Sequence, residues 1–143
     1  MSYRLNPFTG KFDYFQAGGT ADDANRIEVT RIVDGTAVSK YDPVSLISAT
    51  DVIPTNVDTR NNATCFGVAL HNAVIGEEVR ILIFGMISDV VFTYPLNAPL
   101  YNSIAGALSL VPTTIVGEYF CQVGKSNGTG SILVEPGKPT EVT

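Results

Sequence analysis

The sequence has little of what most enzymes and nucleic-acid-binding proteins use. It has no tryptophan, one histidine and two cysteines, and charged residues make up only 16% of it, against roughly a quarter in an average domain. Fourteen acidic and nine basic residues give a formal charge of −5. This sign is wrong for binding nucleic acid or an anionic membrane surface. We therefore expect neither as a partner.

Long apolar runs are also missing. No stretch approaches the roughly 18 residues of a membrane-spanning helix, and the first residues lack the pattern of a signal peptide. We expect a protein that is made and kept in the cytoplasm.

Residues for catalysis are equally scarce. A catalytic triad would need His71, the only histidine, and no serine lies in a G-x-S-x-G motif. Cys65 and Cys121 lie in apolar runs, which favours buried reduced thiols and leaves a disulfide or a pair with His71 as alternatives. The acidic pairs 22–23 and 77–78 are adjacent, so their side chains diverge in extended chain. We expect no enzyme, no cofactor and no metal site.

Thirteen glycines and eight prolines divide the 143 residues into short apolar runs. The pattern predicts an all-β fold, a single antiparallel sandwich or barrel of about ten short strands with an extended N-terminal arm. We expect the arm at 1–19, the β-domain at 20–136 and a tail at 137–143, with one helical turn or a linker at 20–25. The expected strands are residues 26–33, 36–38, 44–48, 64–70, 77–84, 89–92, 100–103, 107–110, 118–123 and 130–134.

Several of these runs are apolar on both faces. In 77–84, Val79, Ile81 and Ile83 alternate with Arg80, Leu82 and Phe84, and only the arginine is polar. A free antiparallel domain usually keeps one wet face. We interpret the second face as a contact between subunits of a homo-oligomer, and the alternative is a barrel that covers both faces itself. The candidate interface residues are Arg80, Leu82, Phe84 and Leu133.

The N-terminal segment differs from the rest. Residues 3–15 contain five of the thirteen aromatic residues, around a turn expected at 6–10, and a Gly18-Gly19 hinge follows. We interpret this segment as an arm that docks on another protein, and the alternative is an extra strand of its own domain. The candidate docking residues are Leu5, Asn6, Pro7, Phe8, Thr9, Gly10, Lys11, Phe12, Tyr14 and Phe15.

Two segments resemble proteins of tailed bacteriophages. Residues 5–13 (LNPFTGKFD) are similar to the NPFTGKLD-type segment that begins many fibre, baseplate and head-appendage proteins. Residues 37–136 resemble a β-rich module of fibre and head-decoration proteins. Asn97 stands where that module more often has glycine, and residues 16–36 match none of it. The matching steps are YDPVSL at 41–46, CFGVAL at 65–70, GEEVRILIFG at 76–85, NAPLYNS at 97–103, ALSLVP at 107–112, QVGK at 122–125 and ILVEP at 132–136.

This resemblance implies a non-enzymatic virion protein, commonly a trimer, whose N-terminal stretch anchors it to capsid, neck or tail proteins. We expect an oligomeric fibre-base, tail-spike adaptor or head-appendage subunit, assembled in the host cytoplasm and located in the virion. A capsid decoration (cement) protein is the alternative. A third hypothesis is a small carbohydrate-binding β-domain with Tyr94, Asn97 and Tyr101 at its site.

Overall fold

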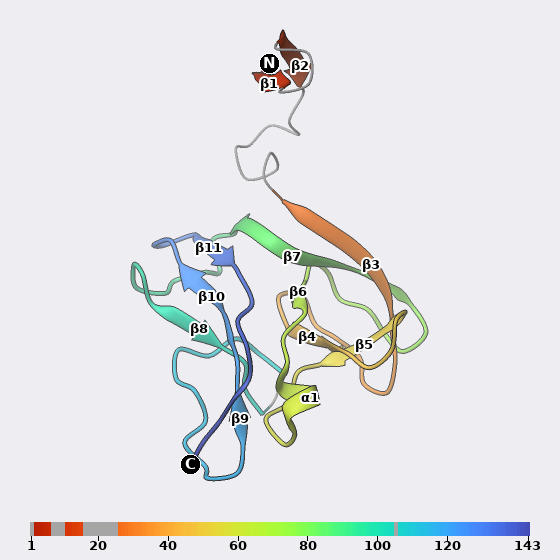
Figure 1. Ribbon diagram of the computed structural model, residues 1–143, viewed down its shortest axis with the longest axis vertical. Coiled ribbons are helices and arrows are strands. Elements are labelled where there is room, and N and C mark those ends of the chain that lie inside the picture. Colours follow the sequence, from red (N-terminus) through yellow and green to blue (C-terminus); the bar gives the residue numbers. More distant parts are fainter. Residues whose placement is uncertain (1, 7–10, 16–25, 105) are drawn as a thin grey trace.

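The computed structural model describes residues 2–6, 11–15, 26–104 and 106–143, and Figure 1 shows that their regular structure is almost entirely strand. The all-β prediction is confirmed. The elements are β1 (Ser2–Asn6), β2 (Lys11–Phe15), β3 (Ile27–Val33), β4 (Pro43–Leu46), β5 (Asp51–Pro54), α1 (Arg60–Ala63), β6 (Gly67–Ala69), β7 (Glu78–Ser88), β8 (Pro99–Tyr101), β9 (Tyr119–Phe120), β10 (Gln122–Ser126), β11 (Ser131–Val134) and β12 (Thr140–Glu141).

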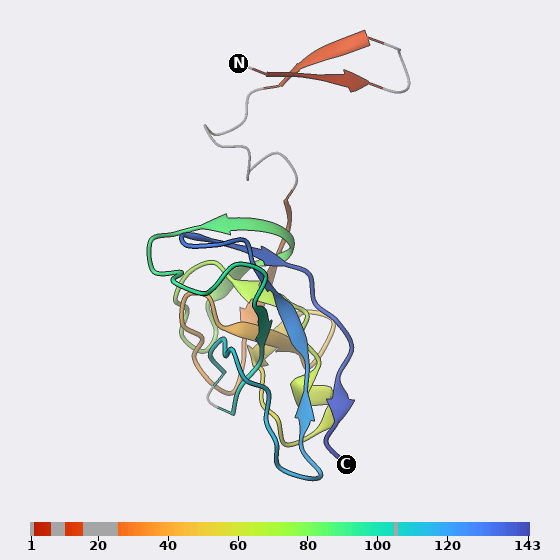
Figure 2. The ribbon, with the colours of Figure 1, turned by 90° about the vertical axis from the view of Figure 1, so that its left-hand side faces the viewer.

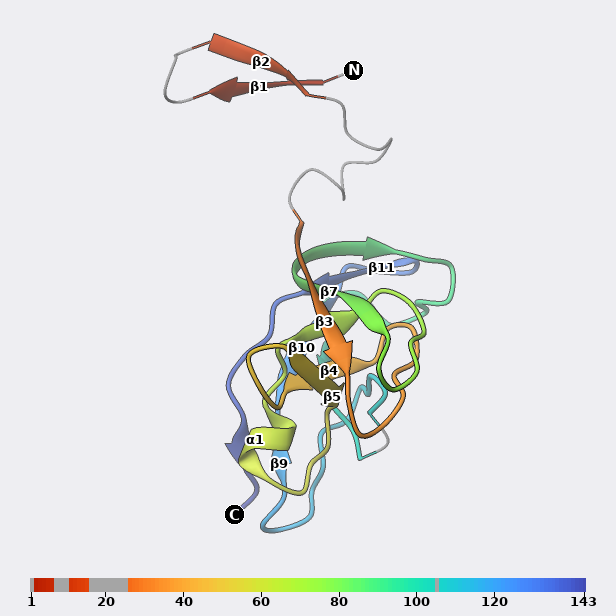
Figure 3. The same cartoon turned by 90° about the vertical axis from the view of Figure 1, so that its right-hand side faces the viewer.

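Five strands close into a barrel. They pair in the order β3-β5-β4-β6-β7, and β7 pairs back to β3 in a ladder from Ile27↔Phe84 to Ile32↔Glu78. Figure 3 shows this half of the molecule facing the viewer. The β3–β5 pair is parallel, so the sheet is mixed, whereas the sequence predicts antiparallel pairing throughout. The reason is the crossover that places β5 between β3 and β4.

The sheet continues beyond the barrel. From β7 it runs on through β11 and β10 to β8 with antiparallel pairs, and β9 and β12 form a separate two-stranded sheet. Figures 1 and 2 show these strands beside the barrel. The expected tail therefore belongs to the fold through β12, since Thr140 pairs with Phe120.

The body has two apolar cores, and β7 supplies both. The barrel core takes Val79 and Ile81 from β7, and the second core takes Leu82 and Ile87. In a regular strand, residues 84 and 86 would share a face with Leu82, and Ile87 would lie on the opposite face. Because Ile87 is in the same core as Leu82, the alternation of β7 is interrupted by one residue between them. Gly85, with φ at 134°, lies at this interruption. The barrel core comprises Val33, Val38, Val44, Val52, Ala69, Ala73, Val79 and Ile81. The second core comprises Cys65, Val68, Leu70, Leu82, Ile87, Phe92, Leu100, Cys121, Val123, Ile132 and Val134.

These two cores correct the interpretation of the two-sided apolar strands. The chain itself covers Val79 and Ile81 on one face of β7 and Leu82 on the other, as in the barrel alternative, and all three are 0% exposed. The apolar pattern at these three residues is therefore explained by the two cores of the fold.

Several element boundaries also differ from the prediction. Residues 36–38 and 107–110 contribute only the single bridges Val38↔Ala73 and Tyr101↔Ser109. The strand expected at 64–70 is shortened because α1 precedes it, with the Thr59 side chain accepting from the Asn62 N–H at 3.1 Å. Strand β5 was missed because its four residues end in Pro54.

The arm contains a β-hairpin. β1 and β2 pair in register from Ser2↔Phe15 to Asn6↔Lys11, and within the described residues their sheet is separate from the others. Residues 7–10 of the expected turn, the Gly18-Gly19 hinge and the 20–25 turn lie outside the described residues.

Close backbone contact requires glycine at two positions of the body. A Cβ atom on Gly124 would lie 1.9 Å from the Leu133 carbonyl oxygen, and one on Gly67 would lie 2.4 Å from that of Leu82. Both neighbours are strand backbone that cannot move aside without breaking a ladder. These glycines fix how closely β10 and β6 approach the adjacent strands.

We predict that Gly124→Ala lowers the free energy of unfolding by about 2 kcal/mol or more, as expected for an overpacked site. Urea denaturation measures it. Gly137→Ala is the matched control, because its Cβ would meet no atom closer than 3.6 Å, and we expect a change within about 0.5 kcal/mol. Equal effects of the two substitutions would contradict this packing.

Candidate interaction surfaces

Tyr41, between β3 and β4, has a backbone conformation that bulky residues rarely adopt. Its φ is 72°, which costs an L-residue about 1–3 kcal/mol. Three contacts hold it there. Its N–H donates to the Ala69 carbonyl at 2.7 Å, its ring lies 4.7 Å from that of Phe92, and its hydroxyl donates to the Asp89 carboxylate.

Lys40 completes this cluster. Its Nζ atom lies 3.7 Å from Asp89 Oδ2 and 4.9 Å from the centroid of the Tyr41 ring. The Tyr41 hydroxyl holds the pKa of Asp89 below its ordinary value, and burial, followed by the bond to Asp89, raises the pKa of Tyr41. The pKa of Lys40 is raised, first by Tyr41. Tyr41 and Lys40 thus favour the charged form of Asp89, and Asp89 favours the neutral form of Tyr41 and the charged form of Lys40.

The cluster fixes the turn that follows β7. Asp89 Oδ1 accepts from the Val91 N–H at 3.1 Å, the Asp89 N–H donates to Gly130 at 2.9 Å, and the Gly130 N–H donates to Phe92 at 2.6 Å. The turn displays Val90 and Val91, which are 88% and 62% exposed. The cluster therefore fixes the position of these two apolar residues. The Tyr41 hydroxyl and the Asp89 carboxylate both form hydrogen bonds within it.

We predict that Tyr41→Phe lowers stability at neutral pH and that the difference from the wild type shrinks in acid. Because the folded pKa of Asp89 is depressed, its contribution is present above its unfolded pKa of about 3.9 and is lost as the pH falls through the folded value. Thermal melts between pH 7 and pH 2 measure this. A difference that is constant with pH would exclude the Tyr41–Asp89 bond as its source.

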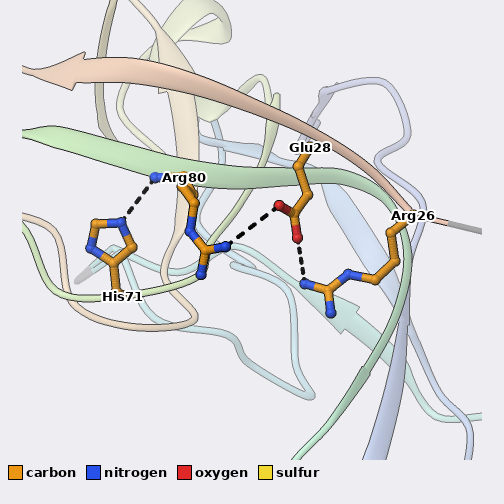
Figure 4. A network of polar contacts seen from close by, with 4 residues as sticks. All are labelled: Arg26, Glu28, His71 and Arg80. Carbon is orange, nitrogen blue, oxygen red and sulfur yellow. Dashed lines mark hydrogen bonds and ion pairs between the residues drawn. The ribbon is translucent and has the colours of Figure 1, made fainter. Parts of the chain in front are cut away.

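His71 closes one end of the β6–β7 ladder. Its Nε2 accepts from the Arg80 N–H at 3.1 Å and its Nδ1 lies 2.9 Å from the Asn72 carbonyl oxygen, so the hydrogen is on Nδ1. Figure 4 shows this contact beside the ion pairs of Glu28 with Arg26 at 2.7 Å and Arg80 at 3.7 Å. Both ring nitrogens bind backbone groups, which leaves neither for use as a catalytic base.

The two cysteines lie in the second core and are free thiols. Burial raises the pKa of both, and their Sγ atoms lie against carbonyl oxygens, Cys65 at 3.4 Å from Gly67 and Cys121 at 3.3 Å from Gly137. A buried thiol of raised pKa is a poor nucleophile. The structure thus places both as core residues.

We predict that neither thiol reacts with Ellman's reagent at pH 8 in the native protein and that two thiols per chain react after denaturation. The physical reason is that attack requires an exposed thiolate. Fast labelling of one native thiol would contradict its burial.

The structure does not gather the four candidate interface residues on one surface patch. Leu82 is 0% exposed in the second core, so its assignment to a subunit contact is wrong. Arg80 is exposed and paired with Glu28, and Leu133 is half-buried. Phe84 is 40% exposed and pairs with Ile27, which is 57% exposed, where the arm joins the body.

Of the candidate docking residues, Leu5 and Asn6 lie in β1, and Lys11, Phe12, Tyr14 and Phe15 lie in β2. The register places Leu5 opposite Phe12 and Tyr3 opposite Tyr14. Pro7, Phe8, Thr9 and Gly10 lie outside the described residues.

The connection between β8 and β9 carries an apolar surface that the sequence patterns do not predict. Five of its side chains are between 43% and 74% exposed, and three of them line a groove of about 220 Å³. The sequence predicts a strand at 107–110 and not an exposed surface. The sequence feature that could have indicated this surface is the set of aliphatic residues that flank Pro112 and precede Gly117. We name these five residues the apolar loop patch: Ile104, Leu110, Val111, Ile115 and Val116.

The three residues of the carbohydrate hypothesis serve the fold. The Tyr94 ring stacks on Phe92 at 6.4 Å, and the Tyr101 ring meets Phe120 edge-on at 5.9 Å. Asn97 has a φ of 62° and donates its N–H to Ser126 at 2.9 Å. The positive φ explains why glycine suits this position.

No protein-family model and no curated protein sequence matches the chain. In the part of the chain that the structure describes, no helix is long and apolar enough to cross a membrane. Over the same residues, no three histidine, cysteine or acidic side chains gather to hold a metal ion.

Proposed function

We propose that the chain is a non-enzymatic structural subunit of a tailed-bacteriophage virion. It docks on another virion protein through its N-terminal hairpin, and the body associates with further copies of the chain, as a trimer by the resemblance. A fibre-base, adaptor or head-appendage subunit fits best. The observation that carries the proposal is the hairpin, whose two strands form a sheet of their own beside a body that closes without them.

The composition of the hairpin supports docking. An isolated two-stranded hairpin is marginally stable in water, and the register of this one pairs Tyr3 with Tyr14 and Leu5 with Phe12. A hairpin with such apolar pairs is stabilised most by packing against an apolar surface of a partner. The phage resemblance of residues 5–13 coincides with this element.

A capsid decoration protein is the second candidate. It is favoured by the body, which in its described part is one barrel with an attached sheet and has no repeated shaft. The two candidates share the adhesive mechanism and differ in the place on the particle.

We predict that deleting residues 1–16 leaves the body folded and abolishes incorporation into particles. The reason is that no described strand of the body pairs with the hairpin. Quantitative blotting of purified particles, with melting of the free protein as the folding control, measures it.

A triple variant refines this test. Leu5→Ala, Phe12→Ala and Tyr14→Ala together should reduce incorporation at least tenfold, whereas Arg4→Ala with Asp13→Ala, a cross-strand pair outside the candidate docking residues, should leave it unchanged. Wild-type incorporation of the deleted chain would exclude the hairpin as the anchor.

A further inference from the structure

A polar cavity of about 300 Å³ lies where the connection between β3 and β4, the residues at the end of β5 and the helix α1 meet. Its volume is at the lower end of the ~300–1,000 Å³ range of small-molecule sites, so its ligand must be small. Six of its eleven lining residues are polar: Thr36, Ser39, Asp42, Thr55, Asn56 and Asn62.

Thr55 brings a buried hydroxyl without a partner to the wall of this cavity. The residue is 2% exposed, and its Oγ1 atom has no hydrogen-bond partner among the described residues. Its N–H donates to the Pro43 carbonyl at 2.9 Å, which fixes the residue against β4. Buried polar side chains nearly always have a partner, and leaving one without a partner destabilises a fold. This hydroxyl therefore indicates a ligand that supplies the missing hydrogen bond.

Asp42 determines the charge that the ligand can carry. Its Oδ2 atom accepts from the Ser39 N–H at 2.9 Å, and no described residue donates to its Oδ1 atom. Burial raises the pKa of this carboxyl, because few solvent molecules reach its charged form. A hydrogen-bond donor would stabilise the carboxylate, whereas an anion would be repelled by it. The ligand is therefore a donor without negative charge.

The other polar groups require a ligand that donates at some positions and accepts at others. The three hydroxyls of the lining can do either. The Asn56 Oδ1 atom already accepts from the Val57 N–H at 2.6 Å, which leaves the Nδ2 atom of this amide to donate. Sugar hydroxyls donate and accept at once, and they match such a mixed lining.

The rest of the lining separates a sugar from other small ligands. Among the described lining residues Asp42 is the one acidic side chain, and a calcium ion takes six to eight oxygen ligands, with carboxylates prominent among them. Ile53, Pro54 and Ile104 give the cavity an aliphatic side, on which the C–H groups of a sugar ring can pack. An amine would use the carboxylate and leave the hydroxyls without partners.

Backbone hydrogen bonds hold the walls of the cavity together. The Asp42 N–H donates to the Ser39 carbonyl at 3.0 Å, and the Asn56 N–H donates to the Asn62 carbonyl in α1 at 2.9 Å. With the bond from Thr55 to Pro43, these contacts join the three segments that form the cavity. The site is therefore formed before it binds, which lowers the entropy cost of binding.

We propose that this cavity binds one uncharged sugar unit, with Asp42 and Thr55 as its central hydrogen-bonding residues. The site is separate from Tyr94, Asn97 and Tyr101, the residues of the carbohydrate hypothesis. It goes beyond the anchoring role proposed for the hairpin and does not depend on it. β3 begins at the arm and ends at the connection that lines the cavity, so the arm junction and the site lie at opposite ends of this strand (Figure 3).

The test is a sugar titration of the full chain, followed by two-dimensional amide NMR. The probes are glucose, galactose, mannose and N-acetylglucosamine, each added alone, and calcium chloride is titrated in parallel. We expect at least one sugar to shift the signals of residues 36–42, 53–56 and 62, with a dissociation constant in the millimolar range. No specific shift with any of the four sugars would overturn the inference, and so would shifts at these residues with calcium chloride alone.

Thr55→Val is the decisive variant, because valine keeps the shape of threonine and removes only the hydroxyl. It should weaken binding of the sugar at least fivefold without lowering the free energy of unfolding, since the hydroxyl that it removes has no partner. Thr140→Val, the same substitution at an exposed residue of β12, is the matched control and should bind like the wild type.

Asp42→Asn is a second variant, used if Thr55→Val melts below the wild type. It removes the charge and keeps the size of the side chain, and it should also weaken binding at least fivefold. Wild-type affinity in a folded variant of either kind would overturn the inference. None of these results bears on the hairpin anchor, because particle incorporation of the arm variants tests that part separately.

Discussion

The structure depends on one strand that is buried on both faces. β7 lies in the barrel through Val79 and Ile81 and in the second core through Leu82 and Ile87, with Gly85 between the two sides. Its pairing with β3 closes the barrel, and its pairing with β11 begins the attached sheet. Without β7 neither core would be enclosed, so the body holds together around this strand.

The residues of the two cores are buried within the body. Contacts with other molecules must therefore use the parts of the chain outside these cores. These parts are the hairpin, the turn fixed by Tyr41 and Asp89, and the apolar loop patch. His71 and the two cysteines are engaged inside the fold. Apolar side chains on fixed turns are suited to adhesion between proteins, which is the work proposed for the chain.

The sequence predicts the fold class well because glycine and proline spacing determines strand length. It predicts residues 26–33 and 130–134 almost to the boundary. It fails where tertiary pairing decides. The parallel β3–β5 pair and the two-residue strand β12 have no local signal, and the single strand expected at 118–123 is divided between β9 and β10. Leu82 fails as an interface residue because alternation in one strand cannot distinguish a second core from a second subunit. The apolar loop patch was missed because isolated aliphatic residues between turns have no periodicity.

The central claim is that the chain is an adhesive part of a virion, and its location tests that claim most directly. Electron microscopy of purified particles, labelled with an antibody against the body of the chain, gives the answer. The account predicts label in discrete groups at one kind of position, on the head, neck or tail. Unlabelled particles, with the protein recovered only free in the lysate, would contradict it.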